Sequence, residues 1–315
     1  MTTTKLKPDW AGEDLLSKFV NLLINNKFIY PLMKNQARQV IIKTAEKNGI
    51  SWRKFVESLD IPQVKQILEE VTNPNIVYPA YYQVPFHAYD EGNLSWQAAF
   101  EAIPATKAMA LRVWKNEPLT WEVAQTRLRQ SFLEILGKYT PKNVENVLDI
   151  GCSVGVSTLA LHRYLSEKNP HINTIGLDLS PYMLAVAKYE DQGGEIKQWV
   201  HGLAEKTDFP DNYFDVITLQ FVTHELPQLP TQEIFKEVLR ILKPGGCFGI
   251  VDNNPKSPVI QNLPPVLFTL MKSTEPWSDE YYTFDIESNL KEIGFNYQIT
   301  VPSDPRHRTI IALKN

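Results

Sequence analysis

The sequence has little cysteine, no long apolar run and no cluster of basic residues, and each absence excludes a class of protein. Two cysteines in 315 residues are too few for a disulfide framework, so we expect a reducing, cytoplasmic location. No apolar run approaches the ~20 residues that cross a bilayer, and residues 1–14 lack the apolar region of a signal peptide. We therefore expect a globular protein without a transmembrane segment.

Positive charge is also scarce where a nucleic-acid surface would need it. The chain has 32 basic and 36 acidic residues, and residues 141–315 hold 15 of the former and 22 of the latter. An acidic half is a poor partner for a phosphate backbone, so we expect no nucleic-acid partner. No pattern indicates an oligomeric state.

The first 140 residues have the periodicity of helices and predict an N-terminal helical or cap domain. The segment 73–96 interrupts this pattern with prolines and aromatic residues and predicts an irregular aromatic strap. The expected helices lie over 15–23, 32–45, 51–59, 94–117 and 120–139.

Residues 141–315 alternate strands and helices, which predicts a second, α/β domain with a mostly parallel sheet. Thr231 is expected to cap one helix, and residues 243–246 to stop it. The insert 252–283 is long and apolar, so we expect an ordered lid with a helix near 265–272. The expected strands lie over 147–150, 174–178, 196–200, 214–221, 247–251, 297–301 and 309–313, the last two as a hairpin with one antiparallel strand.

The segment from Asp149 to Gly155, with the sequence DIGCSVG, follows the first strand and opens a helix. Small residues there let the backbone approach a ligand closely, and ligands of open α/β sheets bind at the carboxyl ends of the strands. A dinucleotide fingerprint would need glycine where Ser153 and Val156 stand. Asp178 ends the second strand, where a carboxylate can accept hydrogen bonds from both hydroxyls of a ribose.

With segments 201–205, 214–225 and 242–246, these motifs resemble the class I S-adenosylmethionine-dependent methyltransferases, in particular the small-molecule branch that includes ubiquinone and menaquinone methyltransferases. The resemblance covers roughly residues 145–252. It implies a doubly wound, seven-stranded, Rossmann-like sheet with an antiparallel C-terminal hairpin. It also implies S-adenosyl-L-methionine as cofactor and methyl transfer to an apolar or aromatic small-molecule acceptor.

The resemblance also implies roles for individual residues. Leu203 stands where many members have an aspartate that binds the adenine amino group, so backbone groups or Glu205 must take that role. Ser153 replaces a middle glycine but is small enough to keep the loop. The implied cofactor-binding residues are Asp149, Gly151, Cys152, Ser153 and Gly155 under the methionine part, Asp178 at the ribose, Leu179, Met183, Leu203 and Ala204 around the adenine, and Gln220 near the methionine end.

Candidate catalytic residues lie in two segments. His224 and Glu225 follow the fourth strand, and His224 is the better general base because histidine titrates near neutral pH. The alternative is a loop histidine bonded to the backbone. His87 and Tyr89 lie in the strap, whose residues 87–93 loosely resemble the H-Y-D-x-G-N stretch of cyclopropane-fatty-acid-synthase-like methyltransferases.

Aromatic side chains of the strap and the lid are candidates for the substrate pocket, although they equally fit a role in packing the helices onto the sheet. We expect no metal ligands, because no local spacing indicates them, and His162 and His171 fit structural roles. A cofactor-binding scaffold or regulator is the alternative function, and a protein or RNA methyltransferase is less favoured. The substrate candidates are Tyr81, Tyr82, Trp96, Phe268 and Tyr282.

Overall fold

A seven-stranded sheet forms the centre of the C-terminal half of the protein. The computed structural model describes residues 14–26 and 28–315. The strand order is β3-β2-β1-β4-β5-β7-β6, and β7 runs antiparallel to both of its neighbours while the other pairs are parallel. This order confirms the predicted mixed sheet with a C-terminal hairpin. The strands are β1 (Asn146–Ile150), β2 (Asn173–Asp178), β3 (Gln198–His201), β4 (Phe214–Gln220), β5 (Leu242–Asn253), β6 (Asn296–Pro302) and β7 (His307–Leu313).

Helices cover both faces of the sheet, because successive side chains of a strand point to opposite faces. In β1, Leu148 and Ile150 pack into the cluster that includes α9 and α13, whereas Val147 packs into the cluster that includes α6 and α7. Burial on both faces explains why most residues of the central strands β1 and β4 are apolar. The covering helices are α6 (Trp121–Leu136), α7 (Val156–Ser166), α8 (Pro181–Glu190), α9 (Gln228–Ile241) and α13 (Ile286–Ile293).

Two predicted boundaries in this half are wrong. Helix α9 begins at Gln228 rather than at Thr231, whose hydroxyl instead donates to the Pro227 carbonyl at 2.8 Å inside the first turn. Strand β5 begins at Leu242, directly after α9, and not at residue 247. Leu242 pairs with Phe214 before the register shifts, so the predicted stop at 243–246 is an irregularity within the strand.

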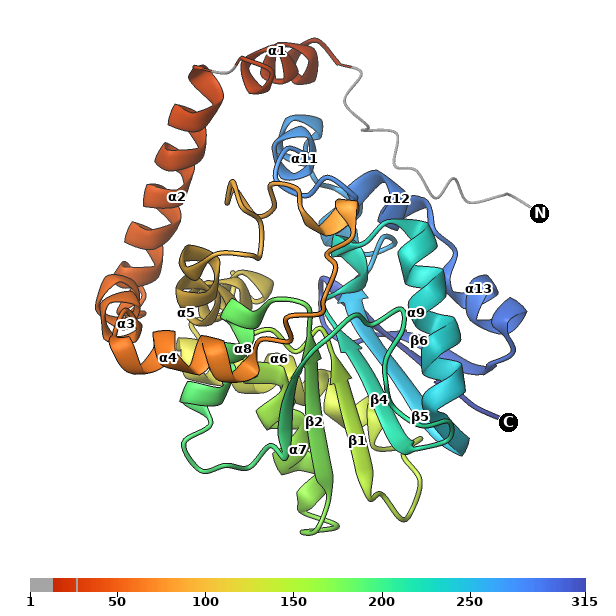
Figure 1. The fold of residues 1–315 in the computed structure, drawn as a ribbon. Coiled ribbons are helices and arrows are strands. Elements are labelled where there is room, and N and C mark those ends of the chain that lie inside the picture. Colours follow the sequence, from red (N-terminus) through yellow and green to blue (C-terminus); the bar gives the residue numbers. More distant parts are fainter. Residues whose placement is uncertain (1–13, 27) are drawn as a thin grey trace, which may run out of the picture.

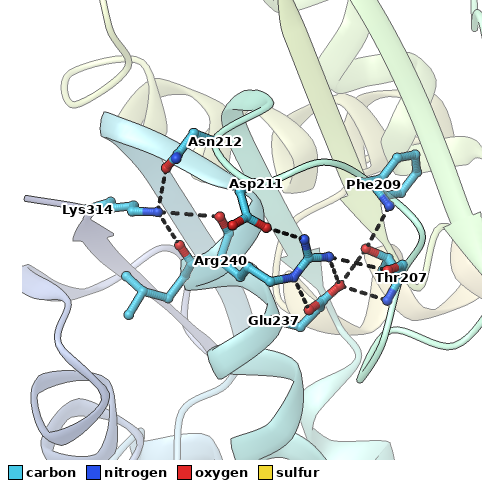
Figure 2. A network of polar contacts seen from close by, with 8 residues as sticks. Thr207, Phe209, Asp211, Asn212, Glu237, Arg240 and Lys314 are labelled. Atoms are coloured by element: carbon cyan, nitrogen blue, oxygen red, sulfur yellow. Dashed lines mark hydrogen bonds and ion pairs between the residues drawn. The ribbon is translucent and has the colours of Figure 1, made fainter.

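A polar network fixes the amino-terminal end of β4 (Figure 2). Arg240 of α9 donates to Glu237 and to Asp211, each at 2.6 Å. Lys314, beyond β7, donates to Asn212 at 2.7 Å. These contacts tie α9 and the end of the chain to the loop before β4, at the opposite end of the sheet from the predicted ligand site.

The N-terminal half is helical, and its strap crosses the carboxyl ends of the parallel strands (Figure 1). The strap is irregular apart from one short 3-10 helix, Ala80–Tyr82. The Asn73 N–H donates to His201 Nδ1 at 2.9 Å, and the Ser180 hydroxyl donates to the Asn93 carbonyl at 2.6 Å. The helices are α1 (Leu15–Ile24), α2 (Ile29–Lys47), α3 (Trp52–Leu59), α4 (Pro62–Val71) and α5 (Trp96–Val113).

The insert after β5 lies at the same end of the sheet and is ordered by three short helices (Figure 1). Helix α11 (Pro265–Lys272) occupies the predicted residues, whereas α10 (Pro258–Gln261) and α12 (Ser278–Thr283) were not predicted. The Thr274 carbonyl accepts from the His87 N–H at 2.8 Å, and the Ser273 carbonyl accepts from the Tyr30 hydroxyl at 2.6 Å. The insert is thereby joined to the strap and to α2.

Within the part of the chain that the structure describes, no helix combines the length and the apolar character needed to cross a membrane.

Candidate active site

The turn between β1 and α7 has a backbone that only small residues tolerate. Gly151 and Gly155 have φ angles of +68° and +79°, and Ser153 has +49°. The Gly151 N–H donates to the Leu177 carbonyl at 2.8 Å, which ties the turn to β2. A Cβ atom at Gly151 would collide with Val222. The turn is therefore held close to the carboxyl ends of β1 and β2, with its backbone open to close approach.

The indole of Trp199 on β3 forms the floor of this turn. A Cβ atom at Gly155 would lie 2.6 Å from the ring, and one at Gly176 of β2 would also lie 2.6 Å from it. Cys152 packs with Trp199 in a small buried cluster, and burial raises the pKa of the Cys152 thiol. Cys152 thus contributes packing beneath the turn.

Asp178 lies at the edge of the turn, as predicted for a ribose-binding residue. Its carboxylate accepts from the Ser153 N–H at 2.7 Å and from the Ser180 N–H at 2.8 Å. Burial raises the pKa of Asp178 to about 6, although these backbone hydrogen bonds act to lower it. Each carboxylate oxygen has a second acceptor position, so the group can bind two further hydroxyl donors.

A buried polar network lies beneath the methionine end of the expected cofactor. Asp149 accepts from Thr158 and Thr218, each at 2.6 Å, and from the Gln220 amide at 3.1 Å. These bonds satisfy the carboxylate and fix the amide of Gln220. Asp149 and Gln220, both of which the resemblance assigns to this end of the cofactor, are therefore in contact with each other.

Arg129 of α6 is a buried arginine close enough to Asp149 to be attracted by it, and the sequence analysis did not single it out. Its side chain is 7% exposed, and one terminal nitrogen donates to Thr106 at 3.0 Å. The other terminal nitrogen and Nε have no hydrogen-bond partner among the described residues. Burial lowers the pKa of Arg129 to about 10, although the nearby charge of Asp149 acts to raise it. Buried donors without partners are costly, so an anionic ligand would stabilise them. A lone arginine in a helical pattern gave no signal for this role.

The strap also reaches the region assigned to the adenine. Leu203 and Ala204 are half-buried beyond β3, and the Tyr81 hydroxyl donates to Glu205. Met183 is buried, 3.5 Å from the Ser153 hydroxyl. Leu179 is half-buried next to Asp178. The residues implied for adenine binding therefore lie beyond the ends of β2 and β3 and, for Met183, in the first turn of α8.

Five side chains from the strap, the β4 exit and the lid gather beside this region. We call them the polar cluster: His87, Asn93, His224, Glu225 and Glu275. His87 Nε2 lies 3.7 Å from Glu225, and the Asn93 amide donates to the other oxygen of Glu225 at 3.1 Å. Donor atoms of His87, His224 and Glu275 lie within 4.8 Å of one another.

His224 is bonded to a buried carboxylate rather than to the backbone alone. Its Nδ1 lies 2.8 Å from Asp252, which also accepts from the His224 N–H at 3.1 Å. Burial alone would lower the pKa of His224, but the pairing with Asp252 raises it to about 10. Burial raises the pKa of Glu225 to about 7, against the attraction of His224.

Other candidates lie apart from the polar cluster. The Tyr89 hydroxyl donates to Glu101 of α5 at 2.9 Å. Trp96 stacks on Phe100 with ring centroids 5.1 Å apart. The structure therefore does not bring Tyr89 or Trp96 to the cluster.

The two lid aromatics are buried. Phe268 and Tyr282 are only 2% and 3% exposed and pack edge to face, 5.7 Å apart, in the main core cluster. Tyr82 of the strap differs from these two residues in its electrostatic surroundings. Burial raises its pKa, and the charges of Asp178 and Glu225 raise it further. Tyr82 is therefore close enough to interact electrostatically with Asp178 and with Glu225 of the polar cluster.

Comparisons with known proteins identify a methyltransferase domain in this chain. Residues 148–250 match the family model described as "Methyltransferase domain". An uncharacterized methyltransferase of Synechocystis sp. is 32% identical over 152 residues, 48% of this chain and 66% of that protein. A demethylmenaquinone methyltransferase of Bacillus licheniformis is 35% identical over 99 residues, 31% of this chain and 40% of that protein.

A solved structure of an S-adenosylmethionine-dependent methyltransferase from Aquifex aeolicus is 21% identical, with a TM-score of 0.46, and the match covers 65% of this chain and 98% of that one. The chain spans less than two thirds of the length of the curated relatives named above. With the strand order, the glycine turn and Asp178 in place, the chain carries a class I S-adenosylmethionine-dependent methyltransferase domain whose cofactor is S-adenosylmethionine.

Proposed function

We propose that this protein transfers a methyl group from S-adenosylmethionine to an apolar or aromatic small-molecule acceptor. One observation supports it above the others: the strap brings His87 and Asn93 to Glu225. The Asn93 carbonyl also accepts from the hydroxyl of Ser180, whose N–H donates to Asp178. Cofactor-binding groups and acid–base groups are thus neighbours under one covering segment. The bound cofactor supplies an electrophilic methyl group on a sulfonium, so the main task of the protein is alignment.

The residues of the site fit this cofactor without rearrangement of the sheet. The turn from Gly151 to Gly155 offers a backbone surface, and Asp178 offers acceptor positions for the ribose hydroxyls. Arg129 offers two buried donors without partners, which suit the carboxylate of the methionine part. Asp149, whose charge attracts Arg129, also accepts a hydrogen bond from the amide of Gln220.

The surroundings of the polar cluster favour an acceptor with an apolar body and one polar group. The Tyr281 ring lies 6.2 Å from the His224 ring, and the Phe86 ring packs edge to face on His87 with centroids 4.2 Å apart. Such a setting suits a reaction that disperses positive charge. We assign contact with the polar group of the acceptor to His224 and Glu225. The demethylmenaquinone methyltransferase among the relatives supports a small-molecule acceptor.

Two broader proposals accompany this one. Residues 1–140 would act as a cap domain on the catalytic residues 141–315, since the strap they carry crosses the strand ends. A cytoplasmic location would fit the two buried, free cysteines.

Calorimetric titration with S-adenosylhomocysteine tests the cofactor part of the proposal. We expect saturable binding, and we expect Arg129→Met to weaken it about tenfold through loss of the carboxylate partner. The matched control is Arg127→Met, because Arg127 lies on the same helix but pairs with Glu117 on the surface. Absence of heat in the unsubstituted protein would refute the cofactor assignment.

Label transfer separates an enzyme from a regulator, the alternative raised by Leu203 in place of the usual aspartate. Protein, labelled S-adenosylmethionine and a lipid-soluble extract are incubated together, and labelled small molecules are resolved by chromatography. A labelled apolar product supports the proposal. Cofactor binding without any labelled product supports the regulator.

A further inference from the structure

Three metal-ligating side chains from distant parts of the chain converge in the polar cluster. His87 comes from the strap, His224 from the exit of β4, and Glu275 from the lid. Each offers one donor atom, and the three atoms lie within 4.8 Å of one another. Two imidazoles and one carboxylate form a donor set that binds divalent transition metals.

The environment of His224 resembles that of a metal-bound histidine. Asp252, only 2% exposed, pairs with Nδ1 at 2.8 Å and leaves Nε2 for a ligand. Asp252 is itself held by the Thr223 hydroxyl at 2.6 Å and by the Asn253 N–H at 2.7 Å. A carboxylate fixed in this way sets the tautomer and the orientation of a metal-binding imidazole.

A backbone hydrogen bond brings His87 close to Glu275. The hydrogen bond from the His87 N–H to the Thr274 carbonyl joins the strap to the residue before Glu275. His87 has a φ of +49° and Ala88 a φ of +68°, which are costly for residues other than glycine. Strain of this kind is retained where the surrounding structure fixes it, and here it turns His87 toward Glu225 and Glu275.

We propose that His87, His224 and Glu275 form a binding site for one divalent transition-metal ion of the Zn²⁺ type. Ligands of a tetrahedral zinc ion at ~2.1 Å are about 3.4 Å apart, so binding would draw the donors together by at most about 1.4 Å. Glu225, 3.7 Å from His87, stands beside the open fourth position.

The proposal deepens the proposed function but does not depend on it. An ion at this place would bind a hydroxyl or carbonyl oxygen of the acceptor and would lower the pKa of a bound hydroxyl. Sequence spacing gives no hint of the site, because its ligands are separated by more than 40 residues at each step. The proposed metal site therefore differs from our expectation, based on sequence spacing, that the chain has no metal ligands.

The test uses the full chain without a histidine tag, stripped with chelator and then titrated with Zn²⁺ alone, and separately with Co²⁺ for its visible absorption. We expect one ion per chain and a cobalt spectrum of low coordination number. His87→Ala and Glu275→Gln should each weaken Zn²⁺ binding at least about tenfold. His171→Ala, an exposed histidine outside the cluster, is the matched control and should bind as the unsubstituted chain does.

Several outcomes would overturn the proposal. They are a lack of stoichiometric binding, equal losses in the His171→Ala control, or full binding by both cluster variants. Thermal unfolding of each variant without metal shows whether a loss of binding reflects a loss of the fold. S-adenosylhomocysteine titration of the same samples reports on the proposed function separately, so the failure of one proposal does not hide the other.

Discussion

The glycine turn from Gly151 to Gly155 and the polar cluster are built in different ways. The turn is fixed by buried strands and by backbone hydrogen bonds such as that between Gly151 and Leu177. The cluster is assembled from three separate segments, and the side chain of His87 in it is 39% exposed. The first site should therefore depend on the integrity of the sheet, and the second on a small number of long-range contacts. The predictions below test this difference, from the largest expected effect to the smallest.

Removal of a core side chain beneath the sheet should have the largest effect. Phe235 of α9 is fully buried, so Phe235→Ala should lower the free energy of unfolding by about 3–5 kcal/mol. Leu267 on the lid helix is 48% exposed, and Leu267→Ala should change it by no more than about 0.5 kcal/mol. Urea denaturation followed by circular dichroism measures both. Similar losses in the two variants would contradict the comparison.

Asp178→Asn should weaken S-adenosylhomocysteine binding about a hundredfold, because a neutral amide loses charge-assisted hydrogen bonds to the ribose. Isothermal titration calorimetry measures the change. Asp208→Asn, an exposed residue after β3, serves as control. Unchanged affinity in Asp178→Asn would remove the ribose role.

The pH dependence of cofactor binding should report on the same carboxyl. Burial raises the pKa of Asp178 to about 6, and the ribose requires its ionised form. Affinity should therefore fall about tenfold from pH 7 to pH 5, in proportion to the ionised fraction. The free energy of unfolding of the unliganded protein should instead rise as the pH falls from 6 toward 4. The reason is that the folded state takes up this proton at a higher pH than the unfolded state does.

Asp178→Asn removes the titrating group and is the control for this pH series. The variant should bind weakly but with a flatter pH profile. An equally steep profile in both proteins would assign the dependence to another group.

Loosening one contact of the strap should have the smallest effect. Tyr81→Phe removes the hydroxyl that donates to Glu205, and it should cost about 1 kcal/mol in the free energy of unfolding. Thermal unfolding compared with Val77→Ala, an 81% exposed strap residue, measures this cost. A loss above about 2 kcal/mol would mean that the strap is as tightly integrated as the sheet.

The difference between the locally encoded turn and the polar cluster, which is assembled from distant segments, also explains which features could be predicted from the sequence. The glycine turn and Asp178 are local motifs at strand ends, so spacing along the chain was sufficient to place them. The start of β5 at Leu242 was missed because its pairing with Phe214 overrides a local stop signal. Arg129 and Glu275 reach the positions proposed for them only through packing between distant elements, and no local pattern records such a contact.

The Trp199 floor of the turn has a consequence for the evolution of this chain. The indole fills the space that side chains at positions 155 and 176 would otherwise use. A larger residue at position 176 would be tolerated only if the residue at position 199 became smaller. Among relatives, positions 176 and 199 should therefore change together, whereas position 155 should stay glycine because its φ is +79°. A library that randomises positions 176 and 199 together should recover functional combinations that no single substitution reaches.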